Sequence, residues 1–139
     1  MIVYLSGPIY PFDKDATDLW RLEAKEYLDE YQIETLDPCR NKAVYTYGEF
    51  TPMEIVLRDL ADVDKSDLLL VNFNLIGDKI PAGTLMEVMY AWGQKKPCVL
   101  VSTDERLTRH PWLLAMSVRI FAQLEDALKY VVEFWGEKV

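Results

Sequence analysis

Glu87 is the residue of this sequence whose position most suggests chemistry. It follows Gly83 and Thr84 at the predicted start of a helix, so that Thr84-x-x-Glu87 has the form of a capping box. A capping box would only stabilise the helix. A carboxylate at a helix N-terminus is also favoured in its ionised form, and an ionised carboxylate can act as the nucleophile in glycoside cleavage. The position leaves both interpretations open.

Asp59 is a second candidate, because it lies within a predicted helix four residues after Ile55 and four before Val63. This spacing places it on or beside the apolar face, whereas Arg58 and Asp62 are expected to be solvated. An acid on a packed face tends to have a raised pKa, which suits a proton donor. The alternative is a carboxylate at the edge of that face, paired with a nearby arginine.

The other motifs do not indicate a specific chemistry. His110 is the only histidine, and His110-Pro111-Trp112 is more typical of a helix start or a subunit contact than of a catalytic triad. Ser6-Gly7-Pro8 is not a dinucleotide fingerprint, and no predicted strand is followed by Gly-Lys-Ser/Thr. Gly7 suits a tight turn or the close approach of a ligand. Most aromatic residues should be core, although several could stack on a base: Tyr4, Tyr10, Tyr45, Tyr47 and Phe50.

The composition is that of one globular domain spanning residues 1–139. Half of the residues are hydrophobic and 27% are charged, which argues against disorder. The net charge of −8 argues against partners such as a nucleic acid polymer or an anionic membrane. The two cysteines fit no zinc or redox spacing, and no apolar run is long enough for a membrane span. The N-terminus lacks the pattern of a signal peptide, so we expect a cytoplasmic protein.

Strand and helix patterns alternate five times along the chain. The predicted strands are Ile2–Ser6, Ile33–Leu36, Leu68–Phe73, Cys98–Val101 and Val118–Phe121. The predicted helices are Thr17–Tyr31, Pro52 to about Asp64 with Thr51 as cap, Thr84 to about Gln94, and Leu124–Trp135. The first helix should bury Leu19, Leu22, Ala24, Tyr27, Leu28 and Tyr31, and Asn41–Phe50 should form a loop.

This alternation predicts an α/β fold, a doubly wound five-stranded parallel sheet of order 2-1-3-4-5 with helices on both faces. Ligands bind such sheets beyond the carboxyl ends of the strands, where the winding reverses. Here that crevice lies between the first and third strands. We expect it to be lined by Ser6-Gly7-Pro8, by Asn72 to Asn74 and by the start of the next helix, with Arg40 at its flank.

Three segments of the sequence resemble the nucleoside 2-deoxyribosyltransferase family, over residues 2 to about 101. Residues 2–8, Ile-Val-Tyr-Leu-Ser-Gly-Pro, resemble its opening strand, and residues 66–72, Ser-Asp-Leu-Leu-Leu-Val-Asn, its central strand. Residues 83–91, Gly-Thr-Leu-Met-Glu-Val-Met-Tyr-Ala, followed by Lys96-Pro97, resemble its nucleophile segment. The related nucleoside 5′-monophosphate N-glycosidases share this framework.

The resemblance implies N-glycosidic chemistry without a metal or organic cofactor. Glu87 matches the nucleophile that forms a glycosyl-enzyme, Asp59 the acid that protonates the leaving base, and Tyr4 the aromatic residue that positions the nucleophile. The remaining expected substrate-binding residues are Ser6, Gly7, Tyr10, Arg40, Asn72, Asp78, Gly83 and Thr84.

Two features depart from the transferases. They usually carry an acidic base-binding residue six positions before the nucleophile, where this chain has Pro81, with Asp78 as the nearest candidate. The C-terminal stretch does not clearly match the segment that completes a neighbouring subunit's site. Arg40 and Lys42 could instead bind a 5′-phosphate, as the monophosphate hydrolases require.

We therefore expect an enzyme that cleaves 2′-deoxynucleosides and transfers the 2-deoxyribosyl group to an acceptor base. The alternatives are hydrolysis of a nucleoside monophosphate and a non-catalytic nucleotide-binding module. The expected partners are a nucleoside or nucleotide, a free base and a second copy of the chain. At least a homodimer is expected, with Trp112 and Trp135 as aromatic contacts and His110 to Met116 near the neighbour's pocket.

Overall fold

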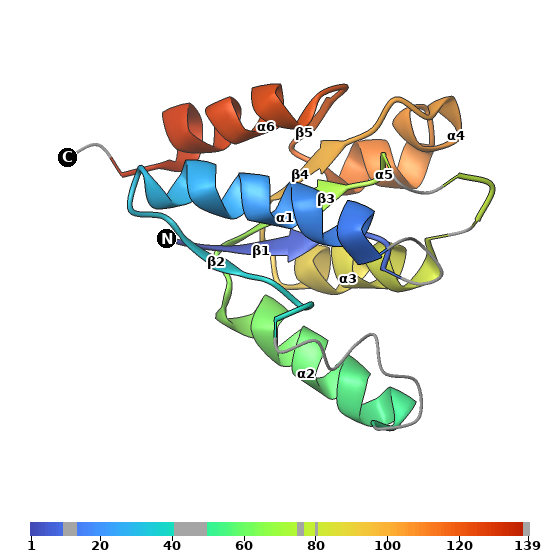
Figure 1. The fold of residues 1–139 in the computed structure, drawn as a ribbon. Coiled ribbons are helices and arrows are strands. Elements are labelled where there is room, and N and C mark those ends of the chain that lie inside the picture. The colour runs from blue at the N-terminus through green and yellow to red at the C-terminus, as the bar shows by residue number, and fades with distance from the viewer. Residues whose placement is uncertain (10–13, 41–49, 75–76, 80, 138–139) are drawn as a thin grey trace.

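The computed structural model describes residues 1–9, 14–40, 50–74, 77–79 and 81–137 (Figure 1). Its sheet has five parallel strands in the order β2-β1-β3-β4-β5, which confirms the predicted fold class and strand order. The strands are β1 (Ile2–Ser6), β2 (Glu34–Leu36), β3 (Leu68–Asn72), β4 (Cys98–Val101) and β5 (Arg119–Phe121).

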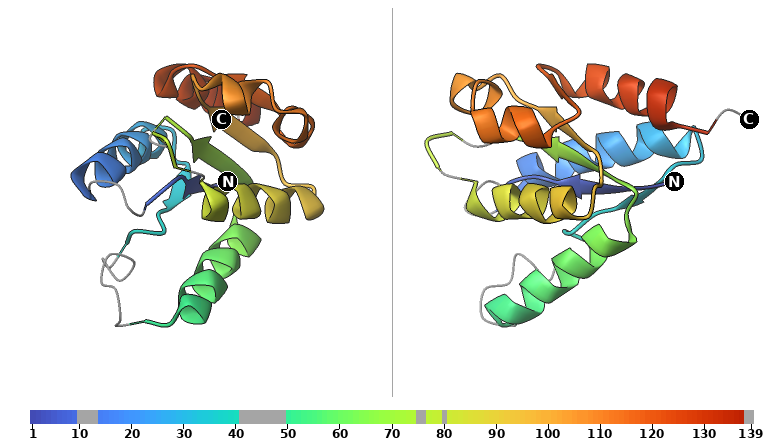
Figure 2. Two further views of the ribbon diagram at one scale, coloured as in Figure 1. Left: turned by 90° about the vertical axis from the view of Figure 1, so that its right-hand side faces the viewer. Right: turned by 180° about the vertical axis from the view of Figure 1, so that it is seen from behind.

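Helices cover both faces of this sheet (Figures 1 and 2). One face packs against α1 (Lys14–Asp29) and α6 (Leu124–Tyr130), and the other against α2 (Pro52–Lys65) and α3 (Ala82–Gly93). The short helices α4 (Glu105–Thr108) and α5 (Pro111–Met116) contribute Leu107 and Leu113 to the α3 side. The chain after α6 continues as a π-helical segment, η2 (Val131–Trp135).

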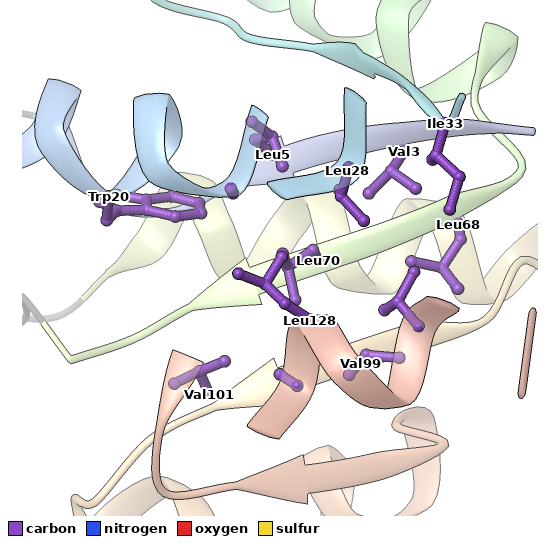
Figure 3. Packing of buried hydrophobic residues seen from close by; sticks show 13 residues of the cluster. Val3, Leu5, Trp20, Leu28, Ile33, Leu68, Leu70, Val99, Val101 and Leu128 are labelled. Carbon is purple, nitrogen blue, oxygen red and sulfur yellow. The ribbon is translucent and has the colours of Figure 1, made fainter. Parts of the chain in front are cut away.

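Successive residues of the central strands belong to opposite cores, as the alternation of side chains in a strand requires. Val3 and Leu5 of β1 pack with α1 and α6, in the cluster drawn in Figure 3. Tyr4 of the same strand belongs to the other cluster, with Leu69 and Val71 of β3. β3 is buried along its whole length, which explains why it reads as a continuous apolar run.

The first helix buries only part of the face that was predicted: Ala24 and Leu28 are core, and Tyr27 packs against it. The structure buries Thr17, Trp20, Arg21, Ala24 and Leu28. Leu19, Leu22 and Tyr31 were expected to be core, but they are 67%, 52% and 50% exposed. A buried arginine, Arg21, shares the inner face with Trp20, so the apolar pattern predicted this face only in part.

The capping box, one of the two interpretations left open for Thr84 and Glu87, is absent. Helix α3 begins at Ala82 with Pro81 as its N-cap, and no side chain caps it. Thr84 is therefore the third helical residue and is buried, and Glu87 lies in the second turn. The box predicted at Thr51 is present in part, since the Thr51 hydroxyl accepts a hydrogen bond from the Glu54 amide at 3.2 Å.

Helix α2 is anchored at one end. Asp62 and Val63 near its C-terminus are buried, whereas Met53, Val56 and Leu57 are mostly exposed, and Figure 1 shows this helix extending away from the sheet. In the described part of the chain, no helix is long and apolar enough to cross a membrane.

Candidate active site

Two hydroxyl groups from β1 hold the carboxyl group of Glu87. Tyr4 and Ser6 are two residues apart on the strand, so both point toward α3. The Tyr4 hydroxyl donates to Glu87 Oε2 at 2.5 Å, and Ser6 Oγ donates to Glu87 Oε1 at 2.8 Å. Each carboxyl oxygen thus accepts one hydrogen bond, and the orientation of the group is fixed.

Burial and these hydrogen bonds act in opposite directions on Glu87. Burial raises the pKa of Glu87, while the bonds from Tyr4 and Ser6 and the charge of Arg21 lower it. The helix start does not contribute as expected, because Glu87 lies in the second turn of α3. Burial and the neighbouring Glu87 raise the pKa of Tyr4, so its phenol keeps the proton that it donates.

Asp59 lies near Glu87 and resists ionisation. Burial, followed by the charge of Glu87, raises the pKa of Asp59 to about 7. Arg58 and Arg40 lower this pKa without restoring the usual value. Among the described residues, none forms a hydrogen bond with the buried Asp59 Oδ1. The prediction of a raised pKa for this acid is confirmed.

Asp62 is not a solvated residue, as the sequence had predicted, but a buried ion-pair partner that is 2% exposed. Both terminal nitrogens of Arg40 donate to its carboxylate, one of them to Oδ1 at 2.9 Å. Arg40 also donates to the Asp37 carbonyl at 3.0 Å. Arg40 therefore lies at the predicted flank of the site, but its guanidinium is already engaged.

The buried Arg21 was missed by sequence analysis. Its side chain donates to the carbonyl oxygens of Leu5, Gly7 and Thr17 at 3.3, 2.9 and 2.9 Å. It thereby fixes the backbone on both sides of Ser6. A polar residue spaced with Trp20 and Ala24 along one helix face was the only available signal.

Gly7 serves packing within the chain. A Cβ atom at this position would lie 2.9 Å from the Asn72 carbonyl oxygen and 3.0 Å from the Trp20 ring. The carboxyl end of β1 can therefore approach β3 closely only with glycine here. Side-chain and backbone atoms of the protein, not a ligand, occupy the space beside Gly7.

The other predicted residues lie at several places around this edge. Asn72 is buried at the end of β3, where its side chain accepts a hydrogen bond from the Asn74 amide at 2.9 Å. Gly83 is exposed in the first turn of α3, whereas Asp78 is exposed near Arg106. Tyr10, Lys42, Tyr45 and Tyr47 lie outside the described residues. His110 caps α5, which confirms it as a helix start.

No group of three or more metal-binding side chains occurs within the described ranges. The chemistry that this arrangement offers is that of two carboxyl groups in different environments. One is oriented by two hydroxyl donors, and the pKa of the other is raised to about 7, so it can both carry and release a proton near neutral pH.

A comparison with protein families identifies the family of the whole chain. The family model for nucleoside 2-deoxyribosyltransferases matches residues 3–137, nearly the whole chain. The chain belongs to the nucleoside 2-deoxyribosyltransferase family. Membership makes it an enzyme of glycosyl transfer or N-glycosidic cleavage, acting on nucleosides or nucleotides and bases.

Solved structures share the fold of this deoxyribosyltransferase family member. A conserved protein from Enterococcus faecalis V583 is 19% identical, with a TM-score of 0.76, over 96% of this chain and 98% of that one. A 2-deoxyribosyltransferase from Bacillus psychrosaccharolyticus is 17% identical, with a TM-score of 0.73, over 94% and 92%. A CMP N-glycosidase from Clostridium botulinum is 17% identical, with a TM-score of 0.64, over 96% and 100%. No curated protein gives a significant match.

Proposed function

We propose that this protein cleaves the N-glycosidic bond of 2′-deoxynucleosides in the cytoplasm and transfers the 2-deoxyribosyl group to an acceptor base. The observation that carries the proposal is the pair of hydrogen bonds that Tyr4 and Ser6 donate to Glu87, near an acid with a raised pKa. A non-catalytic binding module would not need an oriented carboxylate and a protonatable acid together.

In the first step, a carboxylate oxygen of Glu87 attacks the anomeric carbon and the bond from that carbon to the base nitrogen breaks. Asp59 donates its proton to the departing base, so the base leaves neutral and Asp59 becomes ionised. The hydrogen bonds from Tyr4 and Ser6 occupy one acceptor position on each Glu87 oxygen. A further lone pair on each oxygen remains for the attack.

In the second step, a nitrogen of the acceptor base attacks the anomeric carbon and releases the Glu87 carboxylate. Asp59, now ionised, takes the proton that the acceptor loses. Atoms and charge balance over the cycle, and the enzyme returns to its starting state. Interception of the glycosyl-enzyme by water instead of a base would give hydrolysis.

Replacing Tyr4 with phenylalanine is expected to lower kcat by about tenfold or more, because a hydrogen bond to a charged group is lost. The Tyr4 bond lowers the pKa of Glu87, so its loss should also move the acid limb of the pH profile to higher pH. Steady-state kinetics across pH would measure both effects. Tyr90→Phe is the matched control, since it removes a tyrosine bond to Asp64 elsewhere. Equal profiles for the two variants would contradict the assignment.

Transfer and hydrolysis are separated by incubating the protein with deoxynucleosides or their monophosphates, with and without a free acceptor base. Transfer predicts a new deoxynucleoside and faster donor consumption when the acceptor base is present. The second candidate, monophosphate hydrolysis, rests on the position of Arg40 beside the acids and its partial exposure. It predicts free sugar phosphate, no acceptor effect and a higher KM in Arg40→Ala. Chromatography of the products distinguishes them.

We also propose at least a homodimer, joined through α3 and α5. Apolar side chains remain exposed on these helices, including Met86 and Trp112 at 70% and 62%. Between the helices lies a cavity of about 400 Å³, which Leu85, Met89 and Leu113 also line. Light scattering should give a dimer or larger assembly, and Trp112→Glu should shift it toward monomer with loss of activity. A fully active monomeric wild type would contradict this proposal.

A further inference from the structure

The ion pair between Arg40 and Asp62 joins two segments that lie far apart in the sequence. Arg40 follows β2, and Asp62 lies near the C-terminus of α2, 22 residues later. The contact is bidentate, which is the strongest geometry for a guanidinium and a carboxylate. Asp62 is buried, so the pair is not a loose surface contact.

The charges of both members of this pair act on Asp59. Asp59 lies three residues before Asp62, and residues three apart in a helix are neighbours on its surface. The cation of Arg40 therefore acts on Asp59, but both of its terminal nitrogens are bonded to Asp62. Arg58, the residue before Asp59, donates to the Arg40 carbonyl at 2.9 Å.

We propose that Asp62 is a positioning residue that holds the Arg40 guanidinium away from Asp59 and so keeps Asp59 able to carry a proton. In this arrangement the Asp62 carboxylate compensates the positive charge of Arg40, which therefore lowers the pKa of Asp59 less than a free arginine would. The inference deepens the proposed function, since it explains how an acid beside two arginines remains available as a proton donor.

The charges that surround Asp59 show why this pairing matters. Tyr4 from β1, Glu87 from α3, and Arg58, Asp62 and Arg40 all interact electrostatically with Asp59. An arginine paired directly with a carboxylate lowers its pKa by about 1 to 3 units. Direct pairing with Arg40 would thus leave Asp59 ionised at neutral pH, and no proton would be available for the leaving base.

The test is an NMR titration of the Asp59 side-chain carboxyl carbon in aspartate-labelled protein, assigned by its loss in Asp59→Asn. Asp62→Asn removes the competing carboxylate with little change of shape and frees Arg40. The Asp59 pKa should fall by about one unit or more. In the double variant Arg40→Gln/Asp62→Asn, a neutral pair replaces an ion pair, and the pKa should return to the wild-type value.

Asp64→Asn is the control, because it removes a carboxylate from the same helix that is exposed and bonded to Tyr90 and Gln94. It should leave the titration of Asp59 unchanged. An unchanged or raised Asp59 pKa in Asp62→Asn would overturn the proposal, and so would an equally low value in the double variant. Should Asp62→Asn not fold, the double variant still decides, since a pKa lowered by a unit or more contradicts the proposal.

The titration does not depend on turnover. Where the wild type cleaves no nucleoside or nucleotide, the proposed function fails while the NMR result still judges the role of Asp62. Where it does cleave, the basic limb of the kcat/KM profile should move to lower pH in Asp62→Asn and return in the double variant.

Discussion

Glu87→Gln is expected to reduce turnover by roughly 10⁴-fold or more, because an amide oxygen cannot replace the carboxylate as nucleophile. The substitution preserves the size of the side chain and an acceptor for the Tyr4 or Ser6 hydroxyl. It also removes a carboxyl group whose pKa burial raises, so the variant should be at least as stable as wild type. Initial rates together with thermal melting would test both expectations.

A folded Glu87 variant that retains near-normal turnover would exclude the covalent mechanism. A chemical labelling experiment would test the same assignment independently. A 2-fluoro-2-deoxy substrate should leave a mass adduct on the peptide that contains Glu87, because slow breakdown lets the glycosyl-enzyme accumulate. Glu87→Ala, which lacks any nucleophile at this position, should show no adduct.

Asp59→Asn is expected to lower kcat by roughly 10²- to 10⁴-fold, the usual contribution of a general acid. The wild type should lose activity as pH rises through about 7, because the proton of Asp59 is then lost. Below that, activity should fall again as Glu87 becomes protonated, which gives a bell-shaped profile for the coupled pair. The residual activity of Asp59→Asn should lack the limb near pH 7. A wild-type profile flat from pH 6 to 9 would rule out this role.

The same substitution should stabilise the protein at alkaline pH. The Asp59 carboxyl group has a raised pKa in the folded state, so it binds its proton more tightly there than in the unfolded state, and this tighter binding stabilises the fold. Its contribution is fully present below the unfolded pKa near 4 and is lost as pH rises through about 7. Above pH 8 the free energy of unfolding of Asp59→Asn should therefore exceed that of wild type, by up to about 4 kcal/mol. Melting at pH 5 and pH 8.5 would measure the difference, with Asp64→Asn as control.

The strands were predictable because each buried strand is a short apolar run in the sequence. Two of them, Ile2–Ser6 and Cys98–Val101, have the predicted bounds, since each is an apolar run closed by polar or turn-forming residues. The start of α3 was not predictable, because Thr84-x-x-Glu87 fits a capping box as well as it fits the first and second turns of an uncapped helix. Pro81, the actual N-cap, carried no positive signal for that role.

The two candidate acids could be found from their spacing, but their environment could not. Asp62 looked solvated because its partner, Arg40, comes from another segment and no periodicity links the two. Arg21 was not predicted for a similar reason, since it donates to backbone carbonyl groups, which every sequence has, and pairs with Asp37 from another segment. Charges that are compensated by distant or backbone groups leave no local pattern.

The alternation along β1 ties the activity of this protein to its folding. Tyr4 and Ser6 face Glu87, and Leu5 between them packs into the opposite core. A shift of β1 by one residue would exchange these faces, placing hydroxyl groups in an apolar core and Leu5 against a carboxylate. Such a molecule would lose core packing and the nucleophile's donors at once. A preparation should therefore contain few folded but inactive molecules from this cause, and its specific activity should report the fraction that is correctly folded.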